Sequence, residues 1–209
     1  MTETVRRLAG WTARGAILAA LLLAVYPSSR LASQDTLPVG YGTLKRDDIV
    51  VRFATDQIEI QVLPLAEGVI RLLAPDTYRS LEGLLRSRDR EIREAAQRAG
   101  VERPTLVMVT FYGKLPGARF SPEDVNLTSQ GRLFRPVGTV PLSPKWNSYE
   151  LDAREQAVAI YLFEEGVAFR EGLTVSYQGL SSDAWTGVLP TLQREWARVR
   201  ARASLQQSP

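Results

Sequence analysis

The stretch VNLTSQGRLFR, residues 125–135, decides the fold. It contains two short runs rich in strand-forming residues, Val125–Thr128 and Leu133–Arg135, with Gln130-Gly131 as a tight turn between them. Two such runs around a glycine-containing turn predict a β-hairpin, whose strands are antiparallel. The sequence therefore favours an antiparallel β architecture over a parallel α/β sheet.

Strand-like runs also lie on both sides of this hairpin, and residues typical of turns, mostly Gly and Pro, separate them. These runs are Ile49–Phe53, Ile58–Val62, Leu106–Tyr112, Ala157–Phe163 and Leu173–Tyr177. Seven short strands punctuated in this way predict a β-sandwich. The first two form a second hairpin, and the proline-rich residues 132–150 are expected to be an irregular crossover.

The hairpin and its surroundings resemble a known pattern. Phe120–Leu127 (FSPEDVNL), followed by Gly131 and Arg135-Pro136, is similar to a pattern found in exported bacterial immunoglobulin-like sandwich modules. The resemblance spans Thr105 to Tyr177 at most. It implies an immunoglobulin-like antiparallel β-sandwich and no chemistry.

Two segments change to a helical period. Residues 76–100 predict one long amphipathic helix inserted between strands, beginning at Asp76 and ending at Gly100. A second helix is expected after Ser182 or Asp183, with a kink or restart at Pro190. The apolar stripe of the inserted helix includes Leu81, Leu84, Leu85, Ile92, Ala95 and Ala96, and that of the C-terminal helix includes Trp185, Leu192, Trp196 and Val199.

The N-terminal residues 1–33 have the order of a signal peptide. Three arginines precede the uncharged, apolar stretch Gly15–Tyr26, and Pro27 ends it. Twelve residues are too few for a helix across the bilayer, so we expect export and cleavage after Ser33, and an uncleaved short anchor is the alternative. Residues 34–48 are expected to be a linker, 49–203 a single sandwich domain, and 204–209 a disordered tail.

Charge and composition exclude several function classes. Removing residues 1–33 leaves 22 basic and 22 acidic residues, so the basic character of the chain belongs to its N-terminus and does not indicate nucleic-acid binding. The chain has no Cys and no His. Thiol nucleophiles, disulfides, imidazole bases and zinc or haem sites built on these residues are therefore excluded.

The remaining catalytic material is sparse. Asp47-Asp48, Glu123-Asp124 and Glu164-Glu165 are adjacent carboxylates beside turn formers, whereas a glycosidase needs two carboxylates that face each other. No calcium-binding loop motif occurs, and no lysine has a serine three residues before it. Gly40-Tyr41-Gly42 lacks the strand and third glycine of a phosphate-binding loop. We therefore predict no catalytic residues, no metal and no cofactor.

Two sets of residues are candidates for partner binding. A basic stretch on the C-terminal helix is suited to an acidic partner or to anionic lipid headgroups; it comprises Arg194, Trp196, Arg198, Arg200 and Arg202. Aromatic residues in the proline-rich crossover, Trp146 and Tyr149, are suited to a protein interface or to stacking on a sugar.

These features predict a non-enzymatic, extracytoplasmic protein that acts through protein contacts. The expected role is that of an extrinsic structural subunit that braces a membrane protein complex on the periplasmic side, with other envelope proteins as partners. The alternative is a periplasmic ligand- or carbohydrate-binding module. A carboxylate-based hydrolase is the least favoured interpretation, because no facing carboxylate pair is recognisable in the sequence.

Overall fold

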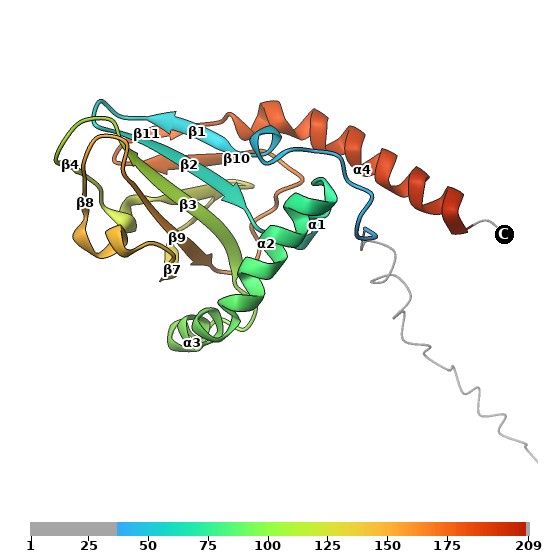
Figure 1. The fold of residues 1–209 in the computed structure, drawn as a ribbon, viewed down its shortest axis with the longest axis horizontal. Coiled ribbons are helices and arrows are strands. Elements are labelled where there is room, and N and C mark those ends of the chain that lie inside the picture. Colours follow the sequence, from blue (N-terminus) through green and yellow to red (C-terminus); the bar gives the residue numbers. More distant parts are fainter. Residues whose placement is uncertain (1–36, 208–209) are drawn as a thin grey trace, which may run out of the picture.

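The computed structural model describes residues 37–207 (Figure 1). The predicted signal peptide, its cleavage after Ser33 and its alternative as an anchor lie outside these residues. Antiparallel sheets and four α-helices make up the fold. One hydrophobic cluster extends from Leu37 near the start of the described chain to Val199 in the last helix.

The larger sheet has five strands in the order β1-β2-β3-β9-β7, and every neighbouring pair is antiparallel. Its central strands β3 and β9 are buried on both faces over most of their length, which matches their long apolar runs. The strands are β1 (Val51–Ala54), β2 (Ile58–Pro64), β3 (Thr105–Gly113), β7 (Pro136–Pro141) and β9 (Gln156–Phe163).

The smaller sheet has the order β11-β10-β5-β6 and contains the predicted hairpin. The pairing of Leu127 with Phe134 is antiparallel, and Gln130 and Gly131 both have positive φ, at 51° and 73°. Two positive φ angles are typical of the two-residue turn that matches the strand twist, so the hairpin is confirmed. The strands are β5 (Asn126–Ser129), β6 (Arg132–Phe134), β10 (Leu173–Tyr177) and β11 (Leu180–Ser182); β4 (Ala118–Arg119) pairs separately with β8 (Glu150–Leu151).

Aromatic side chains join the two sheets. The ring of Tyr177 on β10 lies 5.7 Å from that of Phe111 on β3, and the hydroxyl of Tyr161 donates a 2.9 Å hydrogen bond to the carbonyl of Pro122. Burial raises the pKa of Tyr161 well above its ordinary value, so this hydroxyl stays protonated as a donor. The antiparallel sheets predicted from the sequence are therefore present.

The predicted single helix over 76–100 is wrong, because the structure contains two. Helix α2 (Pro75–Ser87) follows the short α1 (Glu67–Ile70), and α3 (Asp89–Ala99) begins after a single intervening residue, Arg88. Residues 86–91, RSRDRE, are all polar, so no apolar side chain holds a continuous helix against the sheets there. The break directs Ala95 of α3 toward Gly138 of β7.

The division into two helices changes the expected cost of substitutions. Ile92→Ala removes a buried side chain of α3 and is expected to lower the free energy of unfolding by about 2 kcal/mol. Leu84→Ala should cost less, because Leu84 is only partly buried. Arg90→Ala breaks only the exposed Arg90–Glu94 pair and should leave the free energy of unfolding almost unchanged. Urea unfolding measures all three, and equal losses would show that the buried face is misassigned.

Residues 37–48 are packed against the domain, in contrast to the predicted linker. Leu37 and Leu44 are buried, and Leu44 pairs with Leu73 through the hydrogen bonds Leu44 N to Leu72 O (3.0 Å) and Ala74 N to Leu44 O (2.8 Å). The predicted start of the domain near Ile49 is therefore too late. At the other end, α4 (Trp185–Gln207) continues through residues 204–207, which were expected to belong to a disordered tail.

Candidate functional site

Helix α4 extends away from the sheets, and its C-terminal half lies at the opposite end of the molecule from β4 and β8 (Figure 1). Trp185 anchors its first turn, since it is fully buried and its indole N–H donates a 3.1 Å hydrogen bond to the carbonyl of Phe169. Leu192, Val199 and Ala203 continue the buried side of the helix. This apolar stripe leaves other faces of α4 for polar residues.

Three of the predicted arginines lie on exposed parts of α4. Arg194 hydrogen-bonds within its own helix, to the carbonyl of Pro190 and to Thr191. The side chain of Arg198 is 65% exposed and lies 3.7 Å from a carboxylate oxygen of Glu195. The guanidinium of Arg200 lies 3.6 Å from the centre of the Trp196 ring. These three arginines form what we call the α4 arginine face.

Arg202 differs from the other three because it binds Tyr41, in the segment of residues 37–48. Its Nη1 donates to the carbonyl of Tyr41 at 2.5 Å and to Glu195 at 2.9 Å, and its side chain is 38% exposed. The contact with Tyr41 joins α4 to residues 37–48, and the contact with Glu195 lies within α4. Arg202 therefore contributes to the fold, in contrast to the predicted role of all four arginines in partner binding alone.

The buried carboxylate of Glu195 was not recognised in the sequence. Glu195 is 1% exposed and accepts hydrogen bonds from the backbone N–H (3.0 Å) and the hydroxyl (2.8 Å) of Thr43, as well as from Arg202. Burial opposes its ionisation, but the hydrogen bonds from Arg202 and Thr43 outweigh burial and lower its pKa. The one sequence signal for it is its position as the lone acid among residues 185–207, within an arginine-rich helix.

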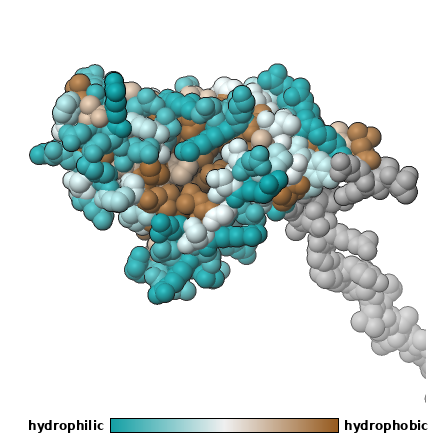
Figure 2. Space-filling model, in the orientation of Figure 1, coloured by the Kyte–Doolittle hydropathy of each residue, from teal (hydrophilic) through white to brown (hydrophobic). Residues whose placement is uncertain are grey.

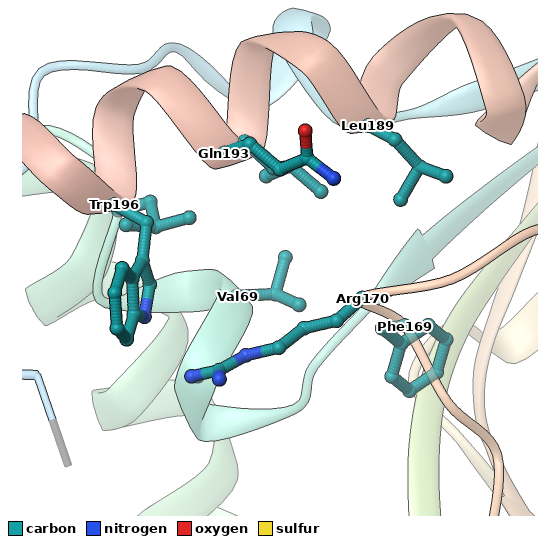
Figure 3. Close-up of a pocket in the computed structure, with 9 residues that line it drawn as sticks. Val69, Phe169, Arg170, Leu189, Gln193 and Trp196 are labelled. Carbon is teal, nitrogen blue, oxygen red and sulfur yellow. The ribbon is translucent and has the colours of Figure 1, made fainter. Parts of the chain in front are cut away.

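A cavity of about 240 Å³ lies between α1, α4 and the loop that precedes β10 (Figure 3). Its walls are mainly apolar, and Arg170 extends along one side toward the indole of Trp196, with 4.8 Å between its guanidinium carbon and the ring centre. The indole nitrogen of Trp196 is buried and has no hydrogen-bond partner. The apolar lining consists chiefly of Val69, Leu72, Phe169, Leu189, Leu192 and Trp196.

The two aromatic residues of the crossover line the same pocket but differ in exposure. Trp146, in a 3-10 turn (Pro144–Ser148), is 3% exposed and packs against Phe111, Phe120 and Tyr161, with ring centres 5.6–5.9 Å apart. Tyr149 is 53% exposed and follows that turn with φ of 56°. Of the two, only Tyr149 is accessible to a partner. It adjoins β8, so it lies far from the C-terminal half of α4 (Figure 1).

The adjacent carboxylates lie at the surface. Asp47 pairs with Arg52 and Glu164 pairs with Arg132, whereas Asp124 accepts a hydrogen bond from Gln178. Within the described part of the chain, no three acidic side chains come together as a metal site. Among residues 37–207, no helix has both the length and the apolarity needed to cross a membrane.

Apolar residues also gather on the larger sheet. Figure 2 shows them on the face seen there, bordered by hydrophilic residues. Leu106 and Val158 belong to this sheet and are partly buried.

No family model, curated protein or solved structure matches this chain significantly.

Proposed function

We propose that this chain is a non-enzymatic, exported protein that acts through protein–protein contacts, as an extrinsic structural subunit bracing a membrane protein complex on the periplasmic side. The observation that carries the proposal is the α4 arginine face, on a helix that extends beyond the sheets. The N-terminal segment supports export, because its sequence has the order of a signal peptide.

The charge of this helix supports an acidic counterpart. Glu195 is the only acid among the described residues of α4, and its buried carboxylate is hydrogen-bonded to Arg202. Arg194, Arg198 and Arg200 therefore present positive charge from a body whose net charge, these arginines included, is zero. Guanidinium groups bind carboxylates with defined geometry, so an acidic surface of another envelope protein is the proposed partner, and anionic lipid headgroups are a peripheral contact for the same face.

We also propose that the two larger sheets form an immunoglobulin-like sandwich. The antiparallel strands and the aromatic contact between Phe111 and Tyr177 support this interpretation. Sandwiches of this architecture occur in many cell-surface domains, so such a scaffold suits a protein that acts by contact.

Joint replacement of Arg194, Arg198 and Arg200 by alanine tests the proposed function. The variant is expected to keep its fold but to lose roughly five- to tenfold in retention on native membranes. The loss is expected because the three exposed ion pairs with the proposed acidic partner are removed. Retention of the wild type should fall with added salt, since exposed charges are screened over about 8 Å at physiological ionic strength. Quantitative immunoblotting of washed membranes measures both effects.

The matched control replaces three exposed arginines of α2 and α3, Arg79, Arg86 and Arg93, and so removes the same charge elsewhere. Equal losses in both triple variants would show that net charge, and not the α4 face, governs retention. Retention unchanged in the α4 variant would remove the support for the bracing role.

The alternative of a periplasmic ligand- or carbohydrate-binding module is favoured by a different observation, the cavity beside Trp196. Its apolar walls suit an apolar ligand better than a sugar, which requires many hydrogen-bonding partners. The described carboxylate pairs lie at the surface, so a hydrolase is not proposed.

A further inference from the structure

We propose that the cavity between α1, α4 and the loop before β10 binds a small carboxylate with a short apolar tail, of about eight carbons. The site is formed by residues on three separate segments, represented by Val69, Arg170 and Trp196 (Figure 3). The inference does not depend on the bracing role, because the cavity is lined by other residues and only Arg200, which lies over the Trp196 ring, also belongs to the α4 arginine face.

The size and lining of the cavity determine the size and chemistry of the apolar part of the ligand. An apolar cavity of about 150 Å³ binds benzene, so about 240 Å³ has room for a larger group. Pockets for drug-sized ligands begin at about 300 Å³, so this volume matches a smaller ligand better. Leu72, Phe169 and Leu192 supply only carbon to this space, and a short alkyl chain matches their chemistry.

The unpartnered indole N–H of Trp196 requires an acceptor. An indole nitrogen is a donor only, and leaving a buried donor unpaired is unfavourable. In Figure 3 the ring nitrogen lies on the side of the indole that faces Val69 and Arg170. A ligand whose polar end carries an acceptor oxygen would satisfy this group while its tail fills the apolar space.

The charge around Trp196 favours a carboxylate over a neutral acceptor. The guanidinium carbons of Arg170 and Arg200 lie 4.8 Å and 3.6 Å from the centre of its ring. Both arginines already have partners within the chain. A guanidinium has five N–H donors, however, and a cation–π contact uses its charge without using all of them. An anionic oxygen at the indole N–H would therefore also be attracted by two positive charges.

Isothermal titration of the full chain with sodium octanoate tests the site, with octanol as the neutral probe of equal tail length. We expect one saturable site with Kd of about 0.1–1 mM for octanoate, and binding of octanol at least about tenfold weaker. Trp196→Phe keeps an aromatic ring but removes the N–H, and should weaken octanoate binding about fivefold. Arg170→Gln should weaken the binding of octanoate but not that of octanol.

Gly68→Leu is the blocking variant. Gly68 lines the cavity, and a Cβ at this position meets no atom within 4 Å, so the larger side chain is accommodated without a backbone clash. It should abolish octanoate binding, whereas Gly83→Leu, on α2 and equally open, should not. Circular dichroism checks that each variant is folded.

Three outcomes would overturn the proposal: no octanoate binding by the wild type up to about 10 mM, equal affinity for octanol and octanoate, or octanoate binding that survives in folded Gly68→Leu. None of them affects the membrane-retention experiment, so failure here and failure of the bracing role are distinguishable.

Discussion

Replacing Glu195 by alanine is expected to lower the free energy of unfolding by about 3–4 kcal/mol, although this residue lies on a helix that is otherwise rich in exposed charge. The substitution removes the acceptor of three hydrogen bonds, two from Thr43 and one from Arg202. It leaves a backbone donor and a partly buried guanidinium without this partner. Chemical denaturation of the full chain at neutral pH measures the loss.

A conservative variant and a double-mutant cycle separate the contributions of the two partners of Glu195 to stability. Glu195→Gln keeps an acceptor oxygen for Thr43 but removes the charge, so it should cost less than alanine. In a double-mutant cycle, Glu195→Ala and Arg202→Ala should be coupled by about 1–2 kcal/mol. Additive losses would show that the 2.9 Å contact between the two side chains does not stabilise the fold.

The same carboxylate makes stability depend on pH. The pKa of Glu195 is lower in the folded state than its ordinary value of 4.5, so the unfolded chain binds the proton more readily between the two values. The stabilisation is fully present above about pH 4.5 and is lost as the pH falls through the lowered pKa. Glu195→Gln should remove this component, so its stability should change less than that of the wild type over this acidic interval.

The sequence predicted most strands because their determinants are local. The turn Gln130-Gly131 and the alternating or continuous apolar runs around it are sufficient for antiparallel hairpins, and β5 and β6 pair as expected. The C-terminal helix was predicted for the same reason, since Trp185, Leu192 and Val199 repeat with its period.

Long-range contacts account for what the sequence did not show. Glu195 and Thr43 are 152 residues apart, so an acid inside a basic helix could not be assigned a buried partner from local patterns. The cavity has the same character, because Val69, Phe169 and Trp196 are brought together only by the fold. The expected accessibility of Trp146 depended on composition, whereas the aromatic packing between Phe111 and Tyr161 decides its burial.

The segment around Gly42 illustrates how composition can mislead. Residues rich in glycine and other turn formers are typical of linkers, and this composition predicts a linker over residues 34–48. Glycine also permits the close approach of two backbones, because it has no Cβ. In the structure Gly42 is buried against residues 72–73, and the hydrogen bond from Leu44 N to Leu72 O lies beside it. The absence of a side chain at Gly42 therefore allows the two backbone segments to pack closely.

Gly42→Ala is accordingly expected to destabilise the protein by about 3 kcal/mol or more. A Cβ at this position would lie 2.3 Å from the carbonyl carbon and oxygen of Leu72 and 2.5 Å from the carbonyl oxygen of Leu73. These atoms belong to the backbone and cannot move aside as a flexible side chain does. Residues 37–48 would have to separate from the domain, which would also weaken the contact of Thr43 with Glu195. Urea denaturation measures the loss of stability.

Gly83→Ala is the matched control, because Gly83 lies inside α2 and an added Cβ meets no atom within 4 Å. It should stabilise the protein by about 0.5–1 kcal/mol, since alanine favours a helix more than glycine does. The two substitutions add the same methyl group, so opposite signs would isolate the steric effect of the close backbone contact. If Gly42→Ala were as stable as the wild type, residues 37–48 would be the flexible linker that their composition indicates, and the network of Glu195 would lose its structural role.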